Sequence, residues 1–152
     1  MRCRIYLDNC CFNRPYDDPR LLVTYLEAEA KLFVQKAIIE NRFELAWSYV
    51  LDYENSANPH VERKRTIAEW KHIAKIDIDA SEEIVTLGKQ MMLKGIKDKD
   101  ALHIACAIKA ECDYFLTTDK KILNKEISDI KIINPLDFVR ILEVWYENRY
   151  DD

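Results

Sequence analysis

Short β-prone segments alternate with longer segments of helical periodicity, and this order restricts the fold more than any other feature of the chain. Periodic apolar positions between the β-prone segments indicate helices. Such alternation is typical of an α/β domain whose mainly parallel sheet is covered on both faces. Because no Gly-, Ser- or Pro-rich linker interrupts the pattern, we expect a single domain over residues 1–152. The β-prone segments are residues 3–7, 43–48, 75–79, 114–119 and 130–134.

Several predicted helices begin at residues that commonly start helices. Pro19 can occupy the first turn of a long helix that continues to the residues before the second strand. Asp79 resembles the first residue of a capping box, and Asp98 resembles an N-cap. Asn134 and Pro135 are suited to the N-cap and first position of the last helix.

Composition excludes several classes of protein. The formal net charge of −4 argues against a generally basic coat for nucleic acid. No segment has enough apolar residues to cross a bilayer, and the N-terminal segment lacks the apolar core of a signal peptide, so we expect a cytoplasmic protein. The five cysteines form no CxxC pair, and we interpret them as small core residues in a reducing compartment. No P-loop, GxGxxG motif or Ser-His-Asp order is present.

Four acidic residues lie at or near the ends of predicted strands. Asp8 ends the first strand and Asp119 ends the fourth, while Glu54 lies on the helix after the second strand. Asp100 lies in the first turn of the helix that precedes the fourth strand. Parallel sheets bind ligands beyond the carboxyl ends of their strands, so these carboxylates can meet at one edge. Each acid alone also fits an ordinary cap, turn or surface role.

A cluster of this kind has a clear chemical use. Carboxylates that meet in a low dielectric repel one another, and a divalent cation removes the conflict. Oxygen ligands suit Mg²⁺ or Mn²⁺, which can activate water and stabilise charge on a phosphodiester. The pattern therefore predicts an acidic metal site.

Three stretches together carry a family resemblance. "IYLDNCCFNRP" contains a strand that ends in Asp8, and "SYVLDYEN" places Ser48 six residues before Glu54. "KDKDALHIACAIKAECDYFLTTDKKIL" contains an Asp that opens an Ala-rich helix, then an apolar strand that ends in Thr-x-Asp. In order and spacing these stretches resemble PIN-domain ribonucleases, which include the toxin nucleases of bacterial and archaeal toxin–antitoxin pairs.

The resemblance implies a three-layer α/β/α sandwich with a five-stranded parallel sheet. It implies a divalent-metal-dependent endoribonuclease with an RNA substrate, a cognate antitoxin that blocks the acidic groove, and a homodimer. Thr117 would orient the site, and Asn9 would have a supporting role. The residues implied as catalytic and as ligands of Mg²⁺ or Mn²⁺ are Asp8, Glu54, Asp100 and Asp119.

The sequence also departs from the family pattern. Asn9 stands where many relatives have Thr or Ser, and Cys10 stands where many have Asn. The stretch "DKKILN" lacks the aromatic residue that often follows the last Asp. These differences indicate a distinct branch of the family.

Residues near the acids suggest further roles. Lys97, Lys99 and Lys120 flank two of the acids and are predicted to steer the RNA backbone. His103 can act as a general acid or metal ligand, although a local hydrogen bond at the helix–sheet boundary is the simpler interpretation. Trp70 and Tyr16 are the aromatic residues that we expect to be exposed for contacts with bases.

Two other functions stay open on the sequence. The domain can be a catalytically silent PIN-like module that binds RNA or protein. A phosphatase with Asp8 as nucleophile is the third hypothesis, although "DNCCF" lacks a second acid two residues later. The segment 22–39 has more apolar residues than one buried helix face needs, which favours a dimer interface there.

Overall fold

A five-stranded, entirely parallel sheet forms the centre of the protein. The structure, a computed structural model, describes residues 3–12 and 21–150, with side chains described as far as residue 144. The strands follow the order β3-β2-β1-β4-β5, and each neighbouring pair is parallel. The predicted α/β class and parallel sheet are therefore confirmed. The strands are β1 (Arg4–Leu7), β2 (Glu44–Ser48), β3 (Ile76–Ile78), β4 (Tyr114–Leu116) and β5 (Lys131–Ile133).

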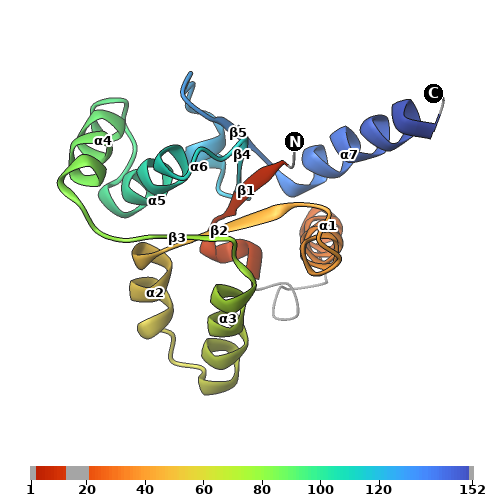
Figure 1. Cartoon of the computed structure of the whole chain (residues 1–152), viewed down its shortest axis with the longest axis horizontal. Coiled ribbons are helices and arrows are strands. Elements are labelled where there is room, and N and C mark those ends of the chain that lie inside the picture. The colour runs from red at the N-terminus through yellow and green to blue at the C-terminus, as the bar shows by residue number, and fades with distance from the viewer. Residues whose placement is uncertain (1–2, 13–20, 151–152) are drawn as a thin grey trace.

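Helices cover both faces of this sheet, which gives the predicted three-layer α/β/α arrangement. In Figure 1, α1, α2 and α3 lie on one side of the strands, and α4, α5 and α6 lie on the other. The last helix, α7, packs against α1. The helical elements are η1 (Asn9–Phe12), α1 (Leu22–Ile39), α2 (Tyr49–Ser56), α3 (Val61–Ile73), α4 (Glu82–Leu93), α5 (Asp98–Lys109), α6 (Lys120–Leu123) and α7 (Pro135–Tyr150).

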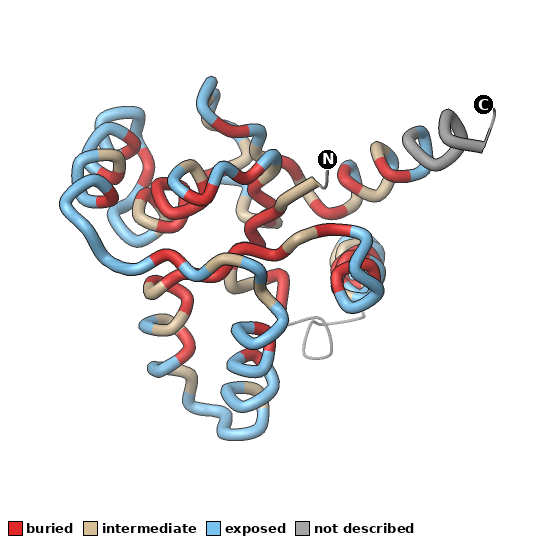
Figure 2. Tube along the Cα trace, viewed as in Figure 1, coloured by how far each residue is buried: buried red, intermediate tan, exposed pale blue. Residues whose placement is uncertain are grey.

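The central strands are buried because both of their faces carry apolar side chains. Figure 2 shows the tube of the inner strands mostly in the colour of buried residues. Tyr6 and Phe115 on neighbouring strands are fully buried and stack with their ring centroids 5.4 Å apart. Trp47 on β2 packs against Phe12 of η1. These contacts join the sheet to its covering layer and hold the ends of β1, β2 and β4 in register.

The chain adds strands on one side of β1 first and then on the other side, beginning with β4. From β1 the chain moves outward to β2 and then β3, and it returns to the far side of β1 to form β4. This reversal is the switch point at which open parallel sheets bind ligands. At this point the Asp8 N–H donates to the Leu116 carbonyl over 2.9 Å, which joins the two strand ends.

Two predicted helix starts were wrong in detail. Ser81, rather than Asp79, caps α4, because its Oγ accepts a hydrogen bond from the Ile84 N–H. Asp98 is the first residue of α5, and the residue at the N-cap is Lys97, which makes no side-chain cap. Asn134 caps α7 as predicted, since its Oδ1 accepts from the Leu136 N–H at 2.8 Å. The predicted start at Pro19 lies outside the described residues, as does Tyr16.

The structure also corrects two expectations about burial. Trp70 is only 8% exposed and packs against Phe12, so it is not the exposed base contact that the sequence suggested. Its helix is strongly charged, but Trp70 lies on the face that is packed against the domain. Of the five cysteines, Cys3 and Cys10 are only partly buried, while the other three belong to the core.

Candidate active site

Thr117 connects two of the predicted site acids. Its Oγ1 donates to Asp8 Oδ2 over 2.7 Å and accepts from the Asp119 N–H over 3.1 Å. The second Asp8 oxygen, Oδ1, accepts from the Asn9 N–H over 2.8 Å. Thr117 is fully buried and Asp8 is 8% exposed, so this arrangement holds the Asp8 carboxylate at the ends of β1 and β4.

Glu54 reaches the same region from α2. Its Oε1 contacts His103 Nε2 on α5 at 2.5 Å, and His103 Nδ1 contacts the Tyr6 hydroxyl at 2.6 Å. The Tyr6 hydroxyl also lies 2.6 Å from Ser48 Oγ at the end of β2. The simpler interpretation of His103, a local hydrogen bond at the helix–sheet boundary, is therefore confirmed. Tyr6 is a residue that the sequence analysis missed, because an apolar strand pattern does not reveal a buried hydroxyl contact.

Asp100 lies in the first turn of α5, where the negative charges of the other acids act on it. Its pKa is raised above the usual value, first by burial and then by the negative charges of Asp8, Asp119 and Glu54, while His103 acts in the opposite direction. An effect of this kind needs each of the other carboxylates to lie near Asp100, in a partly desolvated place. Asp8, Asp119 and Glu54 are therefore each close enough to Asp100 to raise its pKa.

The donor set fits a hard divalent cation in its chemistry. All four acids offer carboxylate oxygens, and their repulsion is the conflict that Mg²⁺ or Mn²⁺ relieves. Within residues 3–12 and 21–144, however, no three His, Cys, Asp or Glu side chains already lie at coordinating distances. Asn9 Oδ1 is buried beside this region and has no hydrogen-bond partner in the described part of the chain.

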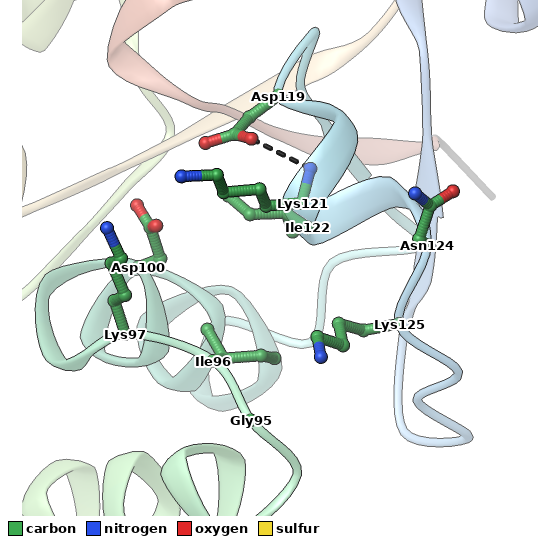
Figure 3. Close-up of a pocket in the computed structure, with 9 residues that line it drawn as sticks. All are labelled: Gly95, Ile96, Lys97, Asp100, Asp119, Lys121, Ile122, Asn124 and Lys125. Atoms are coloured by element: carbon green, nitrogen blue, oxygen red, sulfur yellow. Dashed lines mark hydrogen bonds between the residues drawn. The ribbon is translucent and has the colours of Figure 1, made fainter.

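A cleft of about 400 Å³ opens beside Asp100 and Asp119, between the start of α5 and α6. Figure 3 shows both carboxylates in the lining, together with the side chains of Lys97, Lys121 and Lys125. None of these three lysines forms an ion pair within the described residues. The cleft therefore combines two of the four acids with cationic groups that a phosphate can approach.

The lysines of the cleft differ from those predicted. Lys97 lines it, but Lys99 and Lys120 do not. The Lys99 ammonium lies 6.0 Å from the centre of the Tyr53 ring. Lys125 was missed because its place in the cleft depends on packing against Gly95, which is distant from it in sequence. It fits against Gly95, whose φ of +90° and lack of a Cβ leave space for the ammonium group.

Cys10 adjoins the Asp8 carboxylate, with its Sγ 3.6 Å from Oδ2. It also accepts a hydrogen bond from Thr118 Oγ1 at 3.4 Å. A hydrogen bond with Cys11 lowers the pKa of the Cys10 thiol. Its place in the sequence, two residues after Asp8, is one of the features that distinguish this chain from the family pattern.

Comparison with known proteins addresses the fold. No family model matches the sequence, and no curated protein matches it. Among 17 similar chains of solved structures is one from the crystal structure of VapBC2 from Rickettsia felis bound to a DNA fragment from their promoter. The similarity has a TM-score of 0.53 at 16% identity and covers 86% of this chain and 98% of that chain.

The chain has a PIN-like fold. At 16% identity the likeness concerns the architecture, so the function must be argued from the site. Within the described residues, none of the helices has the length and apolar character needed to span a bilayer.

Proposed function

We propose that this protein is a divalent-metal-dependent endoribonuclease that hydrolyses RNA phosphodiester bonds in the cytoplasm. The observation that carries the proposal is that Thr117 joins Asp8 and Asp119 at the switch point of the parallel sheet. Asp100 senses the charge of the other three site acids, which is the electrostatic situation that a divalent cation relieves. The PIN-like fold supports the same conclusion.

In this proposal Asp8, Glu54, Asp100 and Asp119 hold Mg²⁺ or Mn²⁺. The cation, when bound, supplies activation of water and stabilisation of charge that develops on the phosphodiester. Thr117 orients the site, because one hydroxyl fixes the Asp8 carboxylate and the backbone of Asp119 together. The Asn9 N–H fixes the other Asp8 oxygen, which is its supporting role.

The test is a titration of Mg²⁺ and Mn²⁺ into the wild-type protein, with a pool of structured and single-stranded RNA in the same tubes. We expect cleavage that depends on the metal and stops when a chelator is added. Cleavage that persists in the chelator contradicts metal dependence. A protein that binds the metal and cuts no RNA contradicts the nuclease.

The cleft beside the acids suggests where the RNA backbone lies. We propose that Lys97, Lys121 and Lys125 attract the phosphates next to the one that is cut. Lys99 and Lys120, which the sequence analysis also selected, are exposed and lie outside the cleft lining, so we assign them only long-range steering.

A double variant, Lys121→Gln/Lys125→Gln, tests this assignment. We expect weaker RNA binding. The logarithm of the RNA association constant should also fall less steeply with the logarithm of salt concentration, by about 1.4 in slope, since each phosphate contact on a single strand contributes about 0.7. Lys89→Gln is the matched control, because Lys89 is an exposed lysine of α4 outside the cleft. An equal effect in the control, or an unchanged slope in the double variant, contradicts the role of the cleft.

We further propose that the enzyme is the toxin of a toxin–antitoxin pair. The likeness in fold to a chain of VapBC2 supports this role, and a cognate antitoxin would then cover the acidic groove. Exposed apolar residues on α1 support a homodimer, which sedimentation velocity would detect. They include Leu22, Val23, Leu26 and Phe33, of which Leu22 is 71% exposed.

One observation favours the alternative of a catalytically silent module that binds RNA or protein. The described acids do not already lie at coordinating distances from a common point. A module of this kind would bind RNA through the lysines of the cleft with equal affinity in the presence of Mg²⁺ and of a chelator. The metal titration above distinguishes the two functions.

A further inference from the structure

A row of hydrogen bonds, which we call the relay, begins in the buried core and ends on the partly buried Glu54 carboxylate. It consists of Ser48, Tyr6, His103 and Glu54, and it links β2, β1, α5 and α2. Ser48, Tyr6 and His103 each have no exposed surface. Burial of this much polar surface is costly unless every buried group has a hydrogen-bond partner. The directions of the hydrogen bonds can therefore be assigned by giving each buried donor an acceptor.

The assignment starts from Glu54, because an ionised carboxylate only accepts hydrogen bonds. His103 therefore donates from Nε2, and in the tautomer that carries only this proton Nδ1 is an acceptor. The Tyr6 hydroxyl then donates to Nδ1 and accepts from Ser48. Ser48 Oγ in turn accepts from the Leu51 N–H at the start of α2. In this direction the hydroxyls of Ser48 and Tyr6 and both ring nitrogens of His103 have partners.

Packing holds the members of the relay in place. The Tyr6 ring stacks on Phe115 and meets the His103 ring edge-on at 5.6 Å between centroids. Neither ring can turn without opening the core. Asp100 and His103 are three residues apart on α5, so they lie on the same helix face. One helix therefore supplies one site acid and holds another.

We propose that His103 is a positioning residue for Glu54. Tyr6 and Ser48 hold the imidazole as the Nε2–H tautomer, and the Nε2–H group then fixes Oε1 of Glu54. Within the described residues no hydrogen bond reaches the other oxygen, Oε2, which stays available to a divalent cation. The inference rests on the proposed function, because it assigns a partner to one of the four proposed ligands. Outer partners that orient metal ligands in this way commonly affect metal affinity.

Two substitutions of similar polarity separate positioning from a purely structural role. The side-chain amide of His103→Gln can reach the place of Nε2 and donate to Glu54. The shorter amide in His103→Asn can reach only the place of Nδ1, where it can accept from Tyr6. We expect His103→Gln to retain Mn²⁺ affinity within a few-fold and His103→Asn to lose about 10- to 100-fold. Urea unfolding of both variants separates this effect from loss of stability.

The tautomer itself can be measured without metal or RNA. ¹⁵N NMR of the metal-free wild-type protein should show His103 protonated at Nε2 and not at Nδ1. Tyr6→Phe removes the donor to Nδ1, so this variant should lose the strict preference for one tautomer. A wild-type ring protonated at Nδ1 overturns the proposal.

The other outcomes of these experiments distinguish failure of the positioning role of His103 from failure of the proposed nuclease function. If the wild-type protein binds Mn²⁺ and cuts no RNA, the proposed function fails, and the Gln and Asn variants still test positioning by their Mn²⁺ affinities. Equal Mn²⁺ affinities for folded Gln and Asn variants overturn positioning while the nuclease stands. A wild-type protein that binds no Mn²⁺ overturns both.

Discussion

Asp100→Asn is expected to lower metal-dependent RNA cleavage by at least about 100-fold in kcat/KM, or about 2.7 kcal/mol of transition-state stabilisation. Asn keeps the shape of the side chain but removes the negative charge that a divalent cation needs. The same substitution is expected to raise the thermal stability of the metal-free protein. In the wild type, Asp100 must ionise in a partly desolvated place beside three other acids.

The sign of this stability effect follows from the direction of the pKa shift. The folded protein binds the Asp100 proton more tightly than the unfolded chain does, because the pKa is raised from the usual 3.8. The wild type therefore loses stability as the pH rises through this raised pKa, and Asp100→Asn avoids the loss. The difference in Tm should shrink as the pH is lowered towards 3.8.

Thermal unfolding with and without Mn²⁺ completes the test. Added Mn²⁺ should stabilise the wild type, since it binds the folded state, and should stabilise the variant much less. A variant that is less stable than the wild type at neutral pH, or one that still cuts RNA at the wild-type rate, contradicts the acidic metal site.

Leu116→Ala is expected to lower the free energy of unfolding by about 2–5 kcal/mol, because a fully buried leucine leaves a cavity when it is truncated. Leu116 ends β4, and its carbonyl accepts hydrogen bonds from the Asp8 N–H and from the Cys11 thiol. The loss is a large fraction of the stability of a typical domain, which is about 5–15 kcal/mol. Activity should therefore fall at temperatures where the wild type is still folded.

Leu93→Ala is the matched control, since it makes the same chemical change at a residue that is 89% exposed. Its effect should stay within about 0.5 kcal/mol. Urea denaturation of the three proteins, with one shared m-value, measures both differences. Equal destabilisation by the two substitutions would mean that Leu116 is not part of the packed centre of the sheet.

The order of elements and the place of the acids could be predicted from the sequence. Apolar segments without polar interruption indicate strands buried on both faces, as in β1 and β4. Residues that follow such strands must lie at one edge of a parallel sheet, which places Asp8 and Asp119 near each other. Glu54 and Asp100 required the family resemblance as well, because a residue on a helix can face the sheet or the solvent.

Only the tertiary structure decided how the acids are held. The hydrogen bonds of Thr117 to Asp8 and of Tyr6 to His103 join residues that are 109 and 97 positions apart. Local periodicity carries no information about contacts over such separations. The burial of Trp70 and the contact of Lys125 with Gly95 depend in the same way on how elements pack. Periodicity in the sequence determined the helices and strands, because it reflects local geometry, and packing between distant segments determined the partners of each site residue.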